Sequence, residues 1–207
     1  MAFPSTTPDG SETLVADTSA LINLNATGHA DRILGAFPHR VVAVDTVIAE
    51  LDMGRRTGRG DADAVEAWVR AGRVEVVTLD PAGLDQFERL VFGAAVDTLD
   101  DGEATTLAYA AQAGAIAIID ERKATRIARQ TMTSVALITT VDLLAHAAVE
   151  EAMGGARLAD AVHRALTQAR MRVFEHNMPW IIALIGEDRA ASCISLPRGT
   201  PQATAKR

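Results

Sequence analysis

The chain has 207 residues, a formal net charge of −7 and a single cysteine. Hydrophobic residues make up 48% and charged residues 23%, which is the composition of a folded globular protein rather than of a disordered one. The negative charge argues against a broad basic face for nucleic acid, and the lone Cys193 excludes an intramolecular disulfide and a cysteine metal framework.

Short runs rich in Val and Ile predict buried strands, and helical patterns lie between them. The expected strands span residues 14–16, 41–44, 74–79, 115–119 and 135–138. The expected helices span residues 20–26, 30–36, 46–53, 62–71, 81–92, 101–113, 121–130 and 141–152. Alternation of this kind predicts an α/β protein with a parallel sheet covered by helices on both faces.

The pattern changes after the glycine pair at residues 154–155. Residues 156–169 predict another helix, and residues 173–185 are too apolar to remain in water. We therefore expect a C-terminal helical extension that packs on the main domain or on a second subunit. The expected organisation is a flexible N-terminus at 1–12, a main domain at 13–152, the extension at 153–194 and a flexible tail at 195–207.

Membrane and export segments are not expected. Charged residues interrupt every apolar run before it approaches the roughly 20 residues that span a bilayer. The first 12 residues lack a basic region followed by an apolar one, which argues against a secretory signal. We expect a cytoplasmic protein.

Four acidic side chains fall where such a fold would bring them together. Asp17 and Asp120 follow two of the predicted strands, Glu50 lies within a predicted helix, and Glu103 lies at the head of another. Residues just past the carboxyl ends of parallel strands line one crevice, where such folds bind ligands. Carboxylate oxygens are preferred ligands of Mg²⁺ and Mn²⁺, and a cation held by several acids suits attack of water on a phosphodiester. These residues favour a metal-dependent nuclease.

Most of these acids also have a purely structural explanation. Asp17 and Asp120 precede predicted helices, where a short carboxylate caps exposed N–H groups. Asp100 and Glu103 have the spacing of a capping box. Glu50 differs because it lies within the apolar stripe of its helix, where a carboxylate needs a partner or a cation.

Two local basic clusters would serve a nucleic-acid ligand in this acidic chain. The first comprises Arg55, Arg56 and Arg59, and the second comprises Arg122, Lys123, Arg126 and Arg129. The alternative is an ordinary solvated loop for the first cluster. For the second, it is the exposed face of a helix that begins with acids and ends with bases.

Four segments, taken in order, resemble the PIN-domain family. They are VADTSALI at 15–22, VDTVIAEL at 44–51, LDDGEA at 99–104 and IIDER at 118–122, the last followed by Ala124 and Arg126. The resemblance runs from about Leu14 to Leu144, and the Gly-Glu form of the third segment resembles one bacterial and archaeal branch of the family.

The resemblance implies a PIN-like three-layer α/β/α fold with a five-stranded parallel sheet, and Mg²⁺- or Mn²⁺-dependent cleavage of RNA. Many members, including the VapC-type ribonucleases, are toxins held by a cognate antitoxin, and homodimers are common. The implied catalytic and metal-binding acids are Asp17, Glu50, Glu103 and Asp120. The supporting residues are Thr18, Ser19, Asp101 and Glu121. The basic residues expected to hold RNA phosphates are Arg55, Arg56, Arg59, Arg122, Lys123 and Arg126.

This chain departs from the commonest family pattern in having Glu103 where many relatives have aspartate, and in the length of the segment after Ala152. Two other classes of protein are compatible with parts of this pattern. A haloacid-dehalogenase-type phosphatase would carry a second acid two residues after Asp17, where this chain has Ser19. A non-catalytic RNA-binding or protein-assembly module on the same fold is the main alternative, because the chain is acidic and has an extra apolar C-terminal segment.

Overall fold

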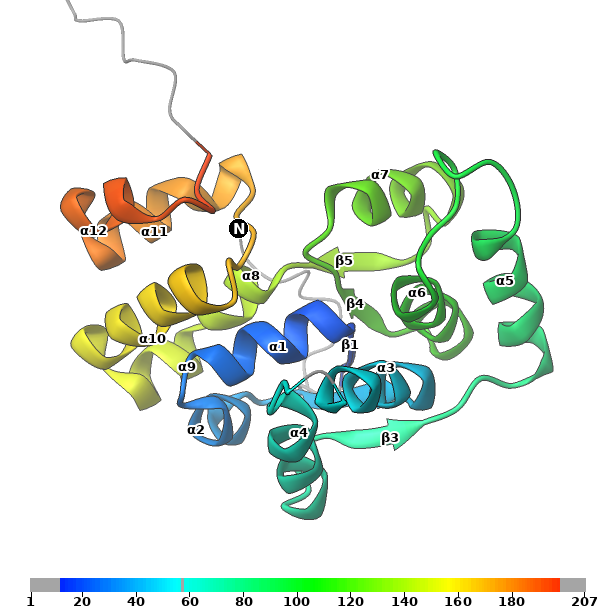
Figure 1. Cartoon of the computed structure of the whole chain (residues 1–207), viewed down its shortest axis with the longest axis horizontal. Helices are drawn as coiled ribbons and strands as arrows, with labels where there is room; N and C mark the ends of the chain where they lie inside the picture. The colour runs from blue at the N-terminus through cyan, green and yellow to red at the C-terminus, as the bar shows by residue number, and fades with distance from the viewer. Residues whose placement is uncertain (1–11, 57, 198–207) are drawn as a thin grey trace, which may run out of the picture.

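The computed structural model of the chain describes residues 12–56 and 58–197. These residues form a five-stranded sheet in the order β3-β2-β1-β4-β5, and every neighbouring pair of strands is parallel (Figure 1). The strands are β1 (Thr13–Ala16), β2 (Arg40–Val44), β3 (Glu75–Val77), β4 (Ile116–Ile118) and β5 (Ala136–Ile138). Each overlaps a predicted strand, so the predicted parallel α/β sheet is confirmed.

The three central strands β1, β2 and β4 are buried on both faces, which is why they form continuous apolar runs in the sequence, whereas the edge strand β3 is largely exposed. Side chains alternate between the two faces of a strand. In β1, Leu14 and Ala16 belong to one hydrophobic cluster and Val15 to the other. In β2, Val41 belongs to the first of these clusters and Val42 to the second.

Helices cover both faces of the sheet and give a three-layer α/β/α fold, as predicted (Figure 1). The first face is covered by α1 (Thr18–Ala26), α2 (Ala30–Ala36), α3 (Asp45–Arg55), α4 (Asp61–Arg70), α8 (Thr140–Leu144) and α9 (Ala147–Met153). The second face is covered by α5 (Pro81–Val91), α6 (Asp101–Ala113) and α7 (Arg122–Thr131).

The C-terminal part of the chain is helical and adds to the first face. It comprises α10 (Gly155–Gln168), the 3₁₀ turn η1 (Glu175–Asn177), α11 (Met178–Ile185) and α12 (Glu187–Ser192). Leu158, Val162 and Leu166 of α10 belong to the same core as the buried side chains of α1, against which α10 packs. Within the described ranges, no helix is both long and apolar enough to cross a membrane.

One helix prediction was wrong in its extent. Residues 141–152 form two helices rather than one, because His146 has an extended backbone and its Nδ1 accepts the N–H of Ala148, which starts α9. The apolar segment 173–185 is part of the expected helical extension, and its α-helix begins at Met178, with Pro179 in the first turn, where the missing N–H of proline costs no hydrogen bond. Of the predicted flexible ends, residues 1–11 and 198–207 lie outside the described residues. The start of the predicted tail is not flexible, because Leu196 is buried in the core and Ser195 donates to the carbonyl of Leu166 at 3.1 Å.

Candidate active site

The sheet reverses its strand order between β1 and β4, and this switch point is where parallel sheets place ligand sites. Asp17 directly follows β1, and Asp120 follows β4 by two residues. Both side chains are buried, with exposed fractions of 2% and 3%. The register pairs Ala16 with Ile118, so the two acids lie at the same edge of the sheet.

Asp17 caps α1, as its position before that helix predicted. Its Oδ1 accepts the backbone N–H of Ala20 at 2.6 Å. The Ser19 hydroxyl also donates to this carboxylate, at 2.9 and 3.0 Å to the two oxygens. A carboxylate has about four acceptor sites, so Asp17 caps its helix and keeps capacity for a further ligand.

Asp120 does not cap α7, so that structural explanation was wrong. Glu121 occupies the cap position, and its side chain accepts the N–H of Lys123 at 3.5 Å. The carboxylate of Asp120 instead accepts three hydrogen bonds from two helices. Asn23 Nδ2 of α1 donates at 2.7 Å, and Thr140 of α8 donates through its N–H at 2.8 Å and its hydroxyl at 2.5 Å.

Asn23 and Thr140 were missed by sequence reasoning. Both are buried polar residues, with exposed fractions of 4% and 0%. The available indication was Asn23 itself, an amide among the apolar residues of the first predicted helix. Thr140 shows no comparable pattern, because its role depends on where β5 ends relative to β4.

Glu50 joins the site from α3 through contacts with two other helices. Its Oε1 accepts the N–H of Gly102 at 2.8 Å, and its Oε2 accepts the hydroxyl of Thr18. A Cβ atom at position 102 would collide with the Glu50 carboxylate, so only glycine permits this approach. Gly102 therefore lets the Glu50 carboxylate approach the start of α6.

Glu103 is half-buried at the first turn of α6, and its carboxylate accepts the backbone N–H of Asp100. Burial raises its pKa to about 7, with further contributions from the charges of Asp100 and Glu121, while Lys123 acts in the opposite direction. The predicted capping box was half right. Glu103 reaches back to the cap residue, but in the described structure the Asp100 side chain makes no cap hydrogen bond.

The buried acids repel one another. Burial raises the pKa of Asp17 well above its usual range, and the charges of Asp120 and Glu103 raise it further. Burial also raises the pKa of Asp120, and its hydrogen bonds to Thr140 and Asn23 oppose that shift. The charges of Asp120 and Glu103 both act on Asp17, so these three acids lie near one another. Glu50 reaches the same region through its contacts with Thr18 and Gly102.

The donor set fits a hard divalent cation, because all four groups are carboxylates and their mutual repulsion favours a positive charge between them. As placed, however, no three Asp, Glu, His or Cys side chains of the described chain converge closely enough to hold a metal ion. The hydrogen bonds explain this arrangement. Asp120 turns both oxygens toward Asn23 and Thr140, and Glu50 turns both toward Gly102 and Thr18.

The C-terminal part of the chain reaches the rim of this site. Arg172 forms an ion pair with Glu121 at 3.0 Å, and Asn177 Nδ2 donates to Asp142 at 2.8 Å. The charge of Asp142 in turn raises the pKa of Asp120.

Asp101, one of the expected supporting residues, is exposed in the first turn of α6.

The first basic cluster is partly engaged by acids. Arg55 forms ion pairs with Asp52 at 3.5 Å, Asp63 at 2.9 Å and Glu66 at 2.7 Å, whereas Arg56 is exposed. The pairs with Asp63 and Glu66 join α3 to α4. Arg59 is exposed as well.

In the second cluster, Arg126 donates to the carbonyl of Val96 at 2.7 Å and to Gln130 at 3.1 Å. Arg122 is exposed, and with Arg170 and Arg172 it lines a cavity of about 300 Å³. The two arginines from the C-terminal part were not expected from the sequence. The run Arg170-Met171-Arg172 was the available indication.

The fold is a three-layer parallel α/β/α fold, and carboxylates line the switch point of its sheet. Such a site suits a divalent cation. The PIN-domain family model matches residues 13–187, so the chain belongs to the PIN-domain family and has a nuclease-type fold. This confirms the family resemblance seen in the four segments. A search of curated proteins found no match.

Proposed function

We propose that the chain is a Mg²⁺- or Mn²⁺-dependent endoribonuclease whose metal-binding acids are Asp17, Glu50, Glu103 and Asp120. One observation carries this proposal. Two buried acids, Asp17 and Asp120, lie at the same edge of a PIN-domain sheet. Burial raises the pKa of both, and the charge of Asp120 raises the pKa of Asp17 further. Buried carboxylates that repel one another are destabilising without a cation, so their presence favours a site for one.

A divalent cation bound there would polarise a water molecule and offset negative charge on the scissile phosphate. The side chains around the acids keep them in place. Asn23 and Thr140 fix Asp120 and leave about one of its acceptor sites free, and Ser19 orients Asp17. Gly102 fixes Glu50 from the opposite face of the sheet.

Glu103 is the best candidate for general base. Without a bound cation its pKa is about 7, near neutral pH, which is the range in which a group both accepts and releases a proton efficiently. As a base it would use a carboxylate oxygen that the cation leaves free. It is also only half-buried and therefore accessible to water.

Arginines beside the acids are suited to hold RNA phosphates. Arg122 follows Asp120 by two residues, and Arg170 and Arg172 line the same cavity. Arg172 is bound to Glu121, whose charge acts on Glu103. These residues join Arg56 and Arg59 as the proposed phosphate contacts, because guanidinium groups bind phosphate oxygens in pairs.

A toxin role with a cognate antitoxin and a homodimer is the finer proposal. It is supported by the Gly-Glu form of the motif at residues 102–103, which resembles the branch that contains toxins of this family. Growth arrest on expression, relieved by the product of an adjacent small reading frame, would support it. Unimpaired growth with an active nuclease would assign the activity to another role.

The test of the activity is cleavage of single-stranded RNA with Mn²⁺, Mg²⁺ or EDTA. The wild type should cut only with metal, and Asp17→Asn should be inactive while its circular dichroism spectrum is unchanged. Asp85→Asn, an exposed acid of α5, is the matched control and should retain activity. RNA binding without cleavage by the wild type would favour the non-catalytic module instead.

A further inference from the structure

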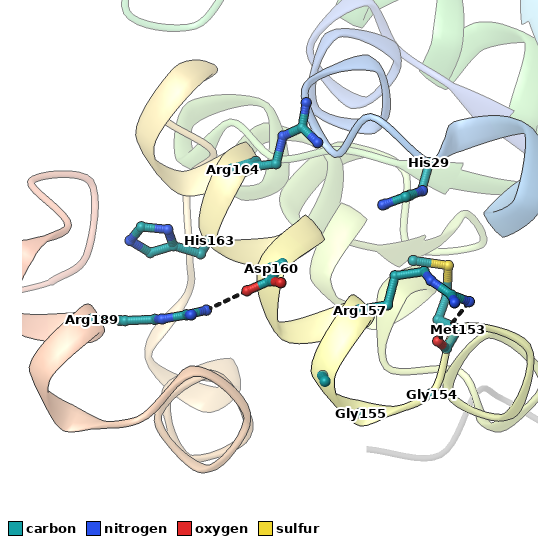
Figure 2. Close-up of a pocket in the computed structure, with 10 residues that line it drawn as sticks. His29, Met153, Gly154, Gly155, Arg157, Asp160, His163, Arg164 and Arg189 are labelled. Atoms are coloured by element: carbon teal, nitrogen blue, oxygen red, sulfur yellow. Dashed lines mark hydrogen bonds and ion pairs between the residues drawn. The ribbon is translucent and has the colours of Figure 1, made fainter.

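A cavity of about 850 Å³ lies away from the carboxylates, and basic side chains dominate its lining (Figure 2). It is bounded by the turn after α1, the junction of α9 with α10, and α12. Asp17 precedes α1 and His29 follows it, so the cavity and the carboxylates lie at opposite ends of this helix. Nine helical residues separate them by roughly 14 Å.

The cavity carries uncompensated positive charge in a chain whose net charge is −7. Asp160 is its acidic lining residue and is neutralised by Arg189 at 2.7 Å. Arg157 and Arg164 form no ion pair within residues 12–56 and 58–197. Both are exposed.

The two arginines are held in place by the backbone around them. The guanidinium of Arg164 lies over Gly28, whose φ is +69°, and a Cβ atom there would lie 2.7 Å from Nη1. His29 extends toward Arg164 across the space between the α1–α2 turn and α10 (Figure 2). Arg157 donates to the carbonyl of Met153 at 3.3 Å, at the opposite rim.

The start of α10 adds donors to the same cavity. This 14-residue helix begins at Gly155 with no acid in its first turn, and no described side chain caps it. Space above Gly154 and Gly155 is open, so a ligand can approach the backbone. The free N–H groups at a helix start carry partial positive charge and favour anions.

From this combination we infer that the cavity binds a phosphate-bearing ligand through Arg157, Arg164 and the start of α10. Guanidinium groups match phosphate oxygens geometrically, and the cavity volume lies within the range of small-ligand sites. The phosphate would come from a free nucleotide or from the backbone of an RNA strand. The inference does not depend on the nuclease proposal, because it uses none of the four acids.

Calorimetry with pyrophosphate in EDTA tests the site on the full chain. The wild type should bind. Combined Arg157→Gln and Arg164→Gln should weaken binding at least about tenfold, equivalent to about 1.4 kcal/mol. Arg89→Gln, an exposed arginine in the last turn of α5, is the control and should bind as the wild type does. Asp17→Asn should also bind normally, so failure here is separable from failure of the nuclease proposal.

The source of the phosphate is distinguished by two further ligands. ATP binding with the same dependence on the two arginines, and no binding of a non-cleavable RNA lacking terminal phosphates, identifies a free nucleotide. Binding of that RNA with the same dependence identifies the strand. Arg164→Lys keeps the charge and should retain part of the affinity, which guards against misfolding of the double variant. Absent pyrophosphate binding, or equal binding by the wild type and the folded double variant, would overturn the inference.

Discussion

The raised pKa of Glu103 predicts an unusual dependence of stability on pH in metal-free protein. The carboxyl has an ordinary pKa of 4.5 and a folded-state pKa of about 7. The folded state therefore binds this proton more tightly than the unfolded state does. The contribution of the protonated carboxyl to the free energy of unfolding is fully present below pH 4.5 and is lost as the pH rises through 7. Replacing Glu103 with Gln, a neutral mimic of the protonated acid, removes this loss.

The size of this stability change follows from the folded-state and ordinary pKa values of Glu103, which differ by about 2.5. At about 1.36 kcal/mol for each pKa unit, the full linkage would be about 3.4 kcal/mol. Glu103 is only half-buried, and water screens it, so we expect about 1 to 1.5 kcal/mol. At pH 8 in EDTA, Glu103→Gln should be more stable than the wild type by that amount, and at pH 4.5 the two should be nearly equal.

Urea unfolding of the two proteins at pH 4.5 and pH 8 measures this difference. Glu88→Gln, an exposed glutamate of α5, controls for the loss of one charge. At neutral pH, Mn²⁺ at about 100 times its dissociation constant should add about 2.7 kcal/mol to the wild type and less to Glu103→Gln. A difference between the wild type and Glu103→Gln that is the same at both pH values would refute the reasoning.

Three further substitutions follow from the contacts at the site. Gly102→Ala should displace the Glu50 carboxylate and reduce cleavage at least about tenfold. The unfolding free energy should be nearly unchanged, because a gain of about 1 kcal/mol in helix propensity offsets the loss of the contact with Glu50. Asp100→Ala should cost less than about 0.5 kcal/mol in urea melts, since its carboxylate makes no cap bond in the described structure. Arg55→Ala should lower stability and leave the affinity for non-cleavable RNA nearly unchanged, because its guanidinium is engaged by three acids. Arg56→Ala with Arg59→Ala should lower affinity alone and flatten its salt dependence.

Each of these has a matched comparison. Gly60→Ala, which adds a Cβ atom in open space, should leave cleavage unchanged. Full activity of Gly102→Ala would show that the position of Glu50 is unimportant. A loss of about 1 kcal/mol or more in Asp100→Ala would mean that its side chain does cap α6. An unchanged salt slope after loss of Arg56 and Arg59 would leave them as ordinary surface residues.

The sheet was predictable from the sequence because parallel strands are buried on both faces. The runs at 14–16 and 115–119 are therefore apolar throughout, and their order along the chain sets the α/β alternation. The break at His146 was not predictable in the same way. Its cap uses Nδ1 of a side chain that also packs against Phe37, a contact made only after folding.

The acids were predictable because residues after strand ends share one edge of a parallel sheet. Their partners were not. Thr140 contacts Asp120 across 20 positions and Asn23 contacts it across 97, so no local pattern links them. Arg172 likewise reaches Glu121 only because the segment after α10 returns to the start of α7.

Crystals of the wild type soaked in Mn²⁺, measured for anomalous scattering, test the central claim most directly. The account predicts an anomalous peak within coordination distance of Asp17 and Asp120, with Glu103 moved toward it, and no peak in crystals of Asp17→Asn. Clear density for all four acids without a manganese peak between them would contradict the metal site, and with it the nuclease.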